Sequence, residues 1–201
     1  MKEHCRSAAF VAMAAATCVL ATPSLVHAHS QTGTIGGLLS GFSHPVAGLD
    51  HVVAMIAVGL WGAFLGKPAM WILPVVFPIV MAFGGAIGVL GAPLPGIEVG
   101  IAVSGIVLGL MIAAARRPPI WIAAAIVGVF AVFHGHAHGT EMPNAADAIA
   151  YPFGFVAATG LLHMSGIACG LLTRWRAGTL VVRTGGAVIG LIGCGFLFGL
   201  L

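Results

Sequence analysis

Charged side chains are scarce in this sequence. Asp, Glu, Lys and Arg make up only 6% of its 201 residues, whereas 60% of the residues are hydrophobic. Soluble domains carry about 25% charged residues, so a folded surface this poor in charge excludes a protein surrounded by water. The formal net charge of +3 is also too small to indicate a nucleic-acid partner. The solvent of this chain is therefore predicted to be largely lipid.

Several motifs are missing as well. The four cysteines show no Cys-x-x-Cys spacing, which argues against a disulfide framework, and Cys169 and Cys194 are interpreted as small buried residues. No nucleotide-binding Gly-rich motif with Lys-Ser/Thr is present, which excludes an ATP-driven pump acting by itself. No His-Glu-x-x-His motif occurs, which argues against a zinc hydrolase of that kind.

What the sequence does have is long, continuous apolar runs. In lipid every backbone polar group needs an internal partner, so spans are helices or a closed barrel, and runs without ten-residue alternation favour helices. The predicted fold is all-α, a polytopic membrane protein with the lipid bilayer as its partner. Each run has ~20 residues or more, enough to cross a ~30 Å hydrocarbon core. The six predicted transmembrane helices cover residues 44–66, 68–91, 96–116, 118–138, 147–173 and 178–200.

The N-terminal residues 1–28 are typical of a secretory signal peptide. Lys2 and Arg6 precede an apolar stretch, and Val26-His27-Ala28 is similar to an A-x-A cleavage site. We expect cleavage there, which leaves residues 29–201 as the transmembrane domain. The alternative that the sequence leaves open is an uncleaved first helix.

The charges predict an orientation in a bacterial inner membrane. After cleavage of the signal, both termini would be periplasmic and the first span would run inward. Alternate loops then differ in charge as the positive-inside rule requires. In this orientation the cytoplasmic loops contain Lys67, Arg116, Arg117, Arg174 and Arg176. The periplasmic ends of the spans contain Glu98, Glu141 and Asp147.

The first chemically distinctive segment is Ser43-His44-Pro45-Val46-Ala47-Gly48-Leu49-Asp50-His51. Ser43 or His44 could cap a helix that accepts Pro45 in its first turn. On one continuous helix His44 and His51 would share a face, ~10 Å apart along the axis. Asp50 inside a span would cost ~3 kcal/mol or more unless it is paired or coordinated. This favours a metal-ligand cluster over the alternative, a polar turn at the entry of a helix.

The second segment is Phe133-His134-Gly135-His136-Ala137-His138-Gly139-Thr140-Glu141. His134 and His138 lie one turn apart and can chelate a metal, and Glu141 follows by three residues. His136 would point away. The alternative is a solvated, histidine-rich loop. The predicted topology brings both segments to the outer face of the membrane, where their nitrogen and carboxylate ligands suit nickel, cobalt, zinc or copper(II).

Two further residues are less certain members of this site. His163 is alone in the fifth predicted span, where it is either hydrogen-bonded between helices or a relay ligand below the outer cluster. Glu98 opens the third span, where it is either a solvated residue that suits the helix dipole or a supporting member of the site.

At these residues the chain resembles the HupE/UreJ family of nickel permeases. The family pattern His-Pro-x-x-Gly-x-Asp-His is matched from His44 to His51, and Phe-His-Gly-x-Ala-His-Gly from Phe133 to Gly139. The resemblance implies secondary uptake of nickel, or of cobalt, for metalloenzyme or cofactor assembly. The residues that it implies for the metal pathway are His44, Asp50, His51, His134, His138 and Glu141. It does not imply such a role for His136, His163 or Glu98.

The sequence therefore predicts a transporter and not an enzyme. Its cargo would be Ni²⁺ or Co²⁺, with Zn²⁺ a weaker candidate, and no cofactor would be permanently bound. The competing hypothesis is an intramembrane zinc-dependent hydrolase built from the same histidines and aspartate. A trail of ligands at several depths suits transport better than a closed catalytic site does. A homo-oligomer is left open.

Overall fold

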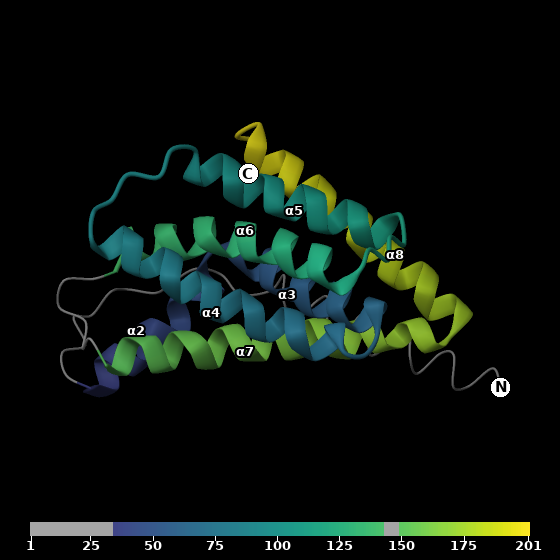
Figure 1. The fold of residues 1–201 in the computed structure, drawn as a ribbon, viewed down its shortest axis with the longest axis horizontal. Coiled ribbons are helices and arrows are strands. Elements are labelled where there is room, and N and C mark those ends of the chain that lie inside the picture. The colour runs from purple at the N-terminus through teal and green to yellow at the C-terminus, as the bar shows by residue number, and fades with distance from the viewer. Residues whose placement is uncertain (1–33, 143–148) are drawn as a thin grey trace. The chain divides into compact units, whose positions relative to one another are not determined.

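The computed structural model describes residues 34–142 and 149–201. The predicted signal peptide and its cleavage site lie outside these residues, as does Asp147. Within them the fold consists of helices without strands, as predicted (Figure 1). The elements are α2 (Thr34–Ala47), α3 (Leu49–Leu65), α4 (Ala69–Val89), α5 (Ile97–Ala113), α6 (Ile120–Thr140), α7 (Ala150–Gly170), the 3₁₀ turn η1 (Leu171–Arg174) and α8 (Arg176–Leu197).

The helices identify a multi-pass membrane protein. Among the described residues, α4, α6, the α7–η1 segment Ala150–Arg174 and α8 are each long and apolar enough to cross a bilayer, and the bent pair of α2 and α3 would be a fifth span. Helix α5, with 17 residues, is shorter. Large apolar side chains such as Trp71, Ile79 and Phe83 are exposed on the outside of the bundle, where lipid would cover them. The last five predicted spans agree with the observed helices to within three residues at each end.

The first predicted span differs from the structure. No helix begins at Ser43 or His44, so that expectation is wrong: α2 starts at Thr34 and carries Pro45 inside its last turn. The chain then breaks at Gly48, whose backbone is extended (φ −94°, ψ 117°), and α3 leaves at an angle of 83° to α2. A proline inside a helix lacks an N–H donor and crowds the preceding turn, which favours a break nearby. His44 and His51 therefore belong to two different helices.

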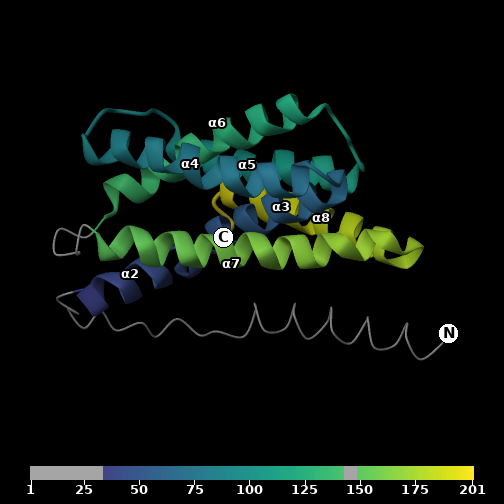
Figure 2. The ribbon, with the colours of Figure 1, turned by 60° about the horizontal axis from the view of Figure 1, so that its bottom comes forward.

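Glycines bring the helices into close contact. Helix α4 packs on α6, α5 on α8, and α7 on both α2 and α3; Figure 2 shows α2 beside the first turns of α7. A Cβ atom at Gly135 would overlap the carbonyl of Met81, and one at Gly139 would overlap that of Gly85. Small residues at such positions let membrane helices approach backbone to backbone. Helix α3 is central, because it also packs against α4, α5 and α8.

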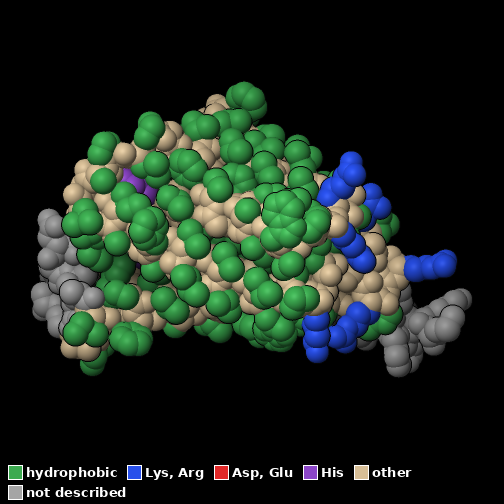
Figure 3. Space-filling model, in the orientation of Figure 1, with side chains coloured by type: hydrophobic (Ala, Val, Ile, Leu, Met, Phe, Trp, Pro, Cys, Tyr) green, Lys and Arg blue, Asp and Glu red, His purple; other side chains and the backbone are tan. Residues whose placement is uncertain are grey.

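The six cations of the described residues gather at one end of the bundle (Figure 3). Two of their side chains contact neighbouring elements, and the backbone carbonyl of a third residue accepts a hydrogen bond. The indole of Trp61, near the end of α3, donates to the carbonyl of Arg116 at 3.3 Å, and the Arg183 guanidinium donates to the carbonyl of Ala113 at 2.8 Å. Arg117 lies over the ring of Phe64, 4.8 Å from its centroid. Since His51 lies in the first turn of α3, the cations and His51 are at opposite ends of that helix.

Candidate metal site

The start of α3 holds a carboxylate–histidine pair. The Oδ1 atom of Asp50 accepts hydrogen bonds from the backbone N–H of His51 at 2.9 Å and from its Nδ1–H at 2.8 Å. A Cβ atom at Gly48 would lie only 2.8 Å from this oxygen and 2.9 Å from Nδ1, so glycine leaves the space that the pair occupies. The helix N-terminus also favours a negative charge at this position.

This pair determines which nitrogen of His51 is free. With its hydrogen on Nδ1, the imidazole has its lone pair on Nε2. That Nε2 is buried and has no hydrogen-bond partner in the described part of the chain. A carboxylate that accepts a hydrogen bond from the other ring nitrogen is the usual support of a metal-binding histidine. The sequence-predicted Asp50 and His51 thus form one unit.

His134 is oriented by a serine in the same manner. The Ser104 hydroxyl, on α5, donates to the carbonyl of Ile101 at 2.6 Å and lies 3.0 Å from His134 Nε2. A hydroxyl has a single hydrogen, so Nε2 is the donor to Ser104 and the lone pair of His134 is on Nδ1. His134 is fully buried, and this Nδ1 has no partner among the described residues.

Four imidazoles from three helices form a continuous row. His44 on α2 contacts His138 on α6 with ring centroids 5.0 Å apart, and His138 contacts His51 at 4.3 Å. His51 then contacts His134 at 5.0 Å. Glu141 extends the row outward, because its Oε2 lies 3.4 Å from His44 Nε2. The structure brings together the residues that the two sequence motifs predicted.

Within this row, ligand atoms cluster at two levels. At the outer level, His44, His138 and Glu141 each offer one ligand atom, and the three atoms lie within 4.8 Å of one another. At the inner level, the ring of His51 contacts both His134 and the buried His138. Neither nitrogen of His138 has a partner in the described residues. Buried polar atoms without partners are unfavourable. A bound divalent cation would satisfy those nitrogens that carry a lone pair, one in each neutral imidazole.

The less certain residues lie apart from the row. The Nε2–H of His136 donates to the carbonyl of Ala92 at 2.7 Å, which ties α6 to the loop after α4, so this side chain faces away from His134 and His138 as predicted. Glu98 is exposed in the first turn of α5. His163 is buried on α7, where its ring contacts Phe77 and not the four histidines.

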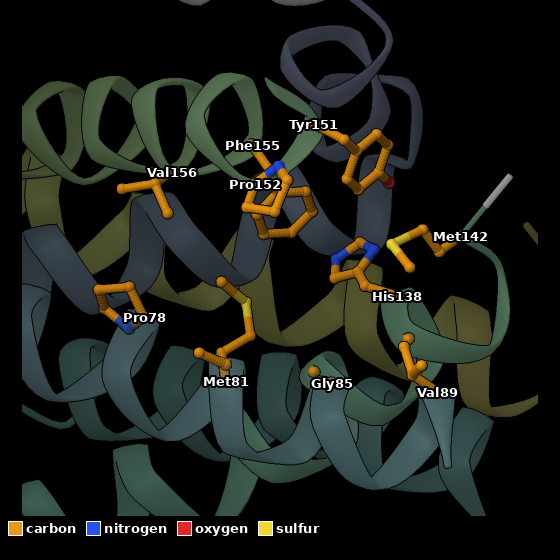
Figure 4. A pocket seen from close by; sticks show the side chains of 13 residues that line it. Pro78, Met81, Gly85, Val89, His138, Met142, Tyr151, Pro152, Phe155 and Val156 are labelled. Carbon is orange, nitrogen blue, oxygen red and sulfur yellow. The ribbon is translucent and has the colours of Figure 1, made fainter. Parts of the chain in front are cut away.

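A cavity of about 210 Å³ opens beside His138 (Figure 4). It lies between α4, α6 and α7, and its lining includes Met81, Met142, Tyr151 and Phe155. The Phe155 ring packs edge-on against His138 with centroids 4.6 Å apart. The hydroxyl of Tyr151 is buried without a partner in the described residues. This cavity is therefore mainly apolar and borders the outer ligand level.

Some residues around the row were missed from the sequence. Ser104 is the single hydroxyl-bearing residue of the predicted span 96–116, and Tyr151 is the single tyrosine of the chain. A lone polar group in an apolar span could have drawn attention to either. Phe77 and Phe155 carry no such signal, because aromatic residues are common in membrane helices.

Comparison with known proteins places these motifs in a family. The family model for HupE / UreJ protein matches residues 16–196 of the chain. Protein HupE from Rhizobium leguminosarum bv. viciae is 45% identical over 180 residues, which cover 90% of this chain and 94% of that protein. No solved structure matches the chain.

Proposed function

The chain belongs to the HupE/UreJ family, and from this membership and its histidine row we propose that it is a secondary transporter for a divalent transition-metal ion. The cargo is nickel or cobalt, taken up across a bacterial inner membrane for metalloenzyme or cofactor assembly. The observation that carries the proposal is the meeting of His44, His51, His134 and His138 from three helices. The carboxylate of Glu141 contacts His44, and that of Asp50 contacts His51.

The proposed topology has six spans, a cleaved signal peptide and periplasmic termini. In it the bent pair α2–α3 is the first span and the shorter α5 is the third. Three features support this arrangement: helices of 17 residues still approach the length that a bilayer requires, the cations gather at one end of the bundle, and the histidine row lies at the other end of α3. The cationic end is cytoplasmic by the positive-inside rule.

In the proposed mechanism the ion moves along the row from its outer to its inner level. His44, His138 and Glu141 capture it, and His51 and His134 receive it. His138 belongs to both levels, so it can hold the ion while the other ligands exchange. The carboxylates of Asp50 and Glu141 offset the double charge during dehydration. The membrane potential contributes ~2.3 kcal/mol per elementary charge per 100 mV, and about twice that for a divalent ion.

The ligands limit the cargo by their chemistry. Imidazole nitrogen with carboxylate oxygen suits nickel, cobalt and zinc and is a poor set for magnesium or calcium. None of these ions is proposed as a resident cofactor, since a transported ion has to leave the site. Zinc is expected to compete with nickel at the row.

The test is uptake of radioactive nickel by cells that lack their own nickel transporter and produce this protein. We expect uptake above the empty-vector level, inhibition by excess cobalt, and weaker inhibition by zinc. Protein that inserts normally but supports no uptake of nickel or cobalt would refute the proposal. If such a protein hydrolysed peptides or esters in a zinc-dependent manner, the hydrolase hypothesis would replace it.

A further inference from the structure

Two buried polar groups on α7 have no role in the row of four histidines. His163 is 2% exposed and Thr159 is fully buried. Neither His163 Nε2 nor Thr159 Oγ1 has a hydrogen-bond partner among the described residues. The two residues are four apart and so share one face of the helix. Unpartnered polar groups in an apolar interior are costly and call for an explanation.

The position of His163 is deeper than the row. The backbone of α7 touches α3 at this point, because a Cβ atom at Gly59 would overlap the His163 carbonyl. Gly59 is eight residues beyond His51, which corresponds to about 12 Å along the helix axis toward the cationic end. Two residues further along α3, Trp61 already binds the carbonyl of Arg116. His163 thus lies between the row and the cationic end of the bundle.

The aromatic ring of Phe77 lies in contact with both His163 and the row. The Phe77 ring, on α4, is fully buried and contacts His134 with centroids 5.6 Å apart. The same ring meets His163 edge-on at 5.4 Å. An ion that leaves His134 toward the cytoplasmic end therefore encounters Phe77 first and His163 next. A phenylalanine can turn about its side-chain torsions, whereas a helix backbone at this point could not yield as readily.

We propose that His163 and Thr159 form a second binding station for the transported divalent metal ion, deeper in the bundle than both levels of the histidine row. The station rests on the proposed transport function. The imidazole Nε2 supplies the ligand that a first-row transition metal prefers, and the Thr159 hydroxyl binds the ion or one of its waters. Phe77 lies between the histidine row and this second station. The ion passes from His134 to His163 when the Phe77 ring rotates away.

The test compares nickel binding with nickel transport in the same purified protein. Binding is measured by equilibrium dialysis of radioactive Ni²⁺ against protein in detergent. Transport is measured as the initial rate of Ni²⁺ uptake into proteoliposomes with an inside-negative potential. The variants are His163→Leu, Thr159→Val and the ligand-retaining His163→Cys. The matched control is Ser165→Ala, whose exposed hydroxyl bonds only to the carbonyl of Leu161 in its own helix.

The expected result is a separation of the two readouts. His163→Leu leaves binding at the outer row within about twofold of wild type but lowers the uptake rate by about tenfold or more, as expected for loss of a step that follows binding. Thr159→Val lowers the rate less, His163→Cys restores part of it, and Ser165→Ala changes neither readout. A residue needed only for packing would instead lower binding and transport together, and a thiol would not restore them.

Two results would overturn the station while transport stands. One is a His163→Leu variant that transports at the wild-type rate. The other is joint loss of binding and uptake in His163→Leu without any restoration in His163→Cys. Absence of uptake by the wild-type protein would instead refute the transport function itself, and the station with it.

Discussion

Two histidines of the row, His51 and His134, are oriented by a hydrogen bond at one ring nitrogen. The Asp50 carboxylate accepts a hydrogen bond from His51 Nδ1–H, and the Ser104 hydroxyl accepts one from His134 Nε2–H. Each hydrogen bond leaves one nitrogen directed toward a potential ion, and metal sites are usually supported in this manner. His138 is different, since both of its nitrogens lack a partner in the described residues. Its orientation therefore depends on packing against Phe155 and on the neighbouring imidazoles.

We expect His138→Ala to abolish uptake without preventing insertion into the membrane. The reason is that His138 contacts both His44 and His51 and so belongs to both ligand levels. His136→Ala, on the same helix, is the matched control and should be much milder, because His136 binds the Ala92 carbonyl instead. Nickel uptake per amount of membrane-inserted protein is the measurement. Equal losses in the two variants would contradict the assignment.

The role of Ser104 can be tested separately from the ligands. Ser104→Ala removes the acceptor for His134 Nε2–H, so this hydrogen bond no longer fixes the tautomer and orientation of the imidazole. Loss of such a supporting group typically weakens metal affinity about 10- to 100-fold. Equilibrium dialysis of Ni²⁺ checks this. Ser43→Ala is the control, because that exposed hydroxyl bonds only to the carbonyl of Ser40; an unchanged affinity for Ser104→Ala would reject the role.

At the scale of the helices, glycines determine which face of α6 meets which neighbour. Gly135 and Gly139 are four residues apart and lie against the α4 backbone. With that face held by α4, His134 and His138 are turned toward α3 and α2, where His51 and His44 lie. The glycines of the Phe-His-Gly-x-Ala-His-Gly pattern therefore serve packing, and the packing orients the histidines.

We expect Gly135→Ala to destabilise the bundle by about 1–3 kcal/mol, the usual cost of forcing an extra methyl group into a close-packed contact. The control is Gly128→Ala on the same helix, where the nearest atom to an added Cβ is 3.9 Å away. That change should be neutral or slightly stabilising, since alanine favours a helix. Thermal unfolding in detergent measures both. Similar midpoints for the two variants would show that α4 and α6 are not in close contact there.

The two ends of the bundle differ, with the histidine row at one end and the cations at the other. The row lies where α3 and α7 begin and α6 ends. The cations lie where α3 and α5 end and where α7 leads into α8. In the proposed transport the ion would bind at the histidine row and leave toward the cationic end, with the membrane potential favouring its movement.

Labelling with a thiol reagent that does not cross membranes tests the proposed topology. In a protein whose cysteines have been replaced, Thr140→Cys, at the end of α6, should react in intact spheroplasts. Lys67→Cys should react only after the membrane is opened, because Lys67 belongs to the cationic end. Both residues are exposed, so access should depend on the side of the membrane. If both cysteines reacted in intact spheroplasts, the proposed topology would be wrong.

The sequence by itself determined the class of the protein and five of its helices, and it identified the histidines that meet in the row. These are local properties: scarce charge excludes water as the solvent, apolar runs predict helices, and His-Pro-x-x-Gly-x-Asp-His is visible within eight residues. Only the tertiary structure decided the break at Gly48, the nitrogen that each histidine leaves free, and the place of Phe77 between His134 and His163. These features depend on side chains from different helices, far apart in the chain, and on backbone contacts that glycines permit, so no local pattern could specify them.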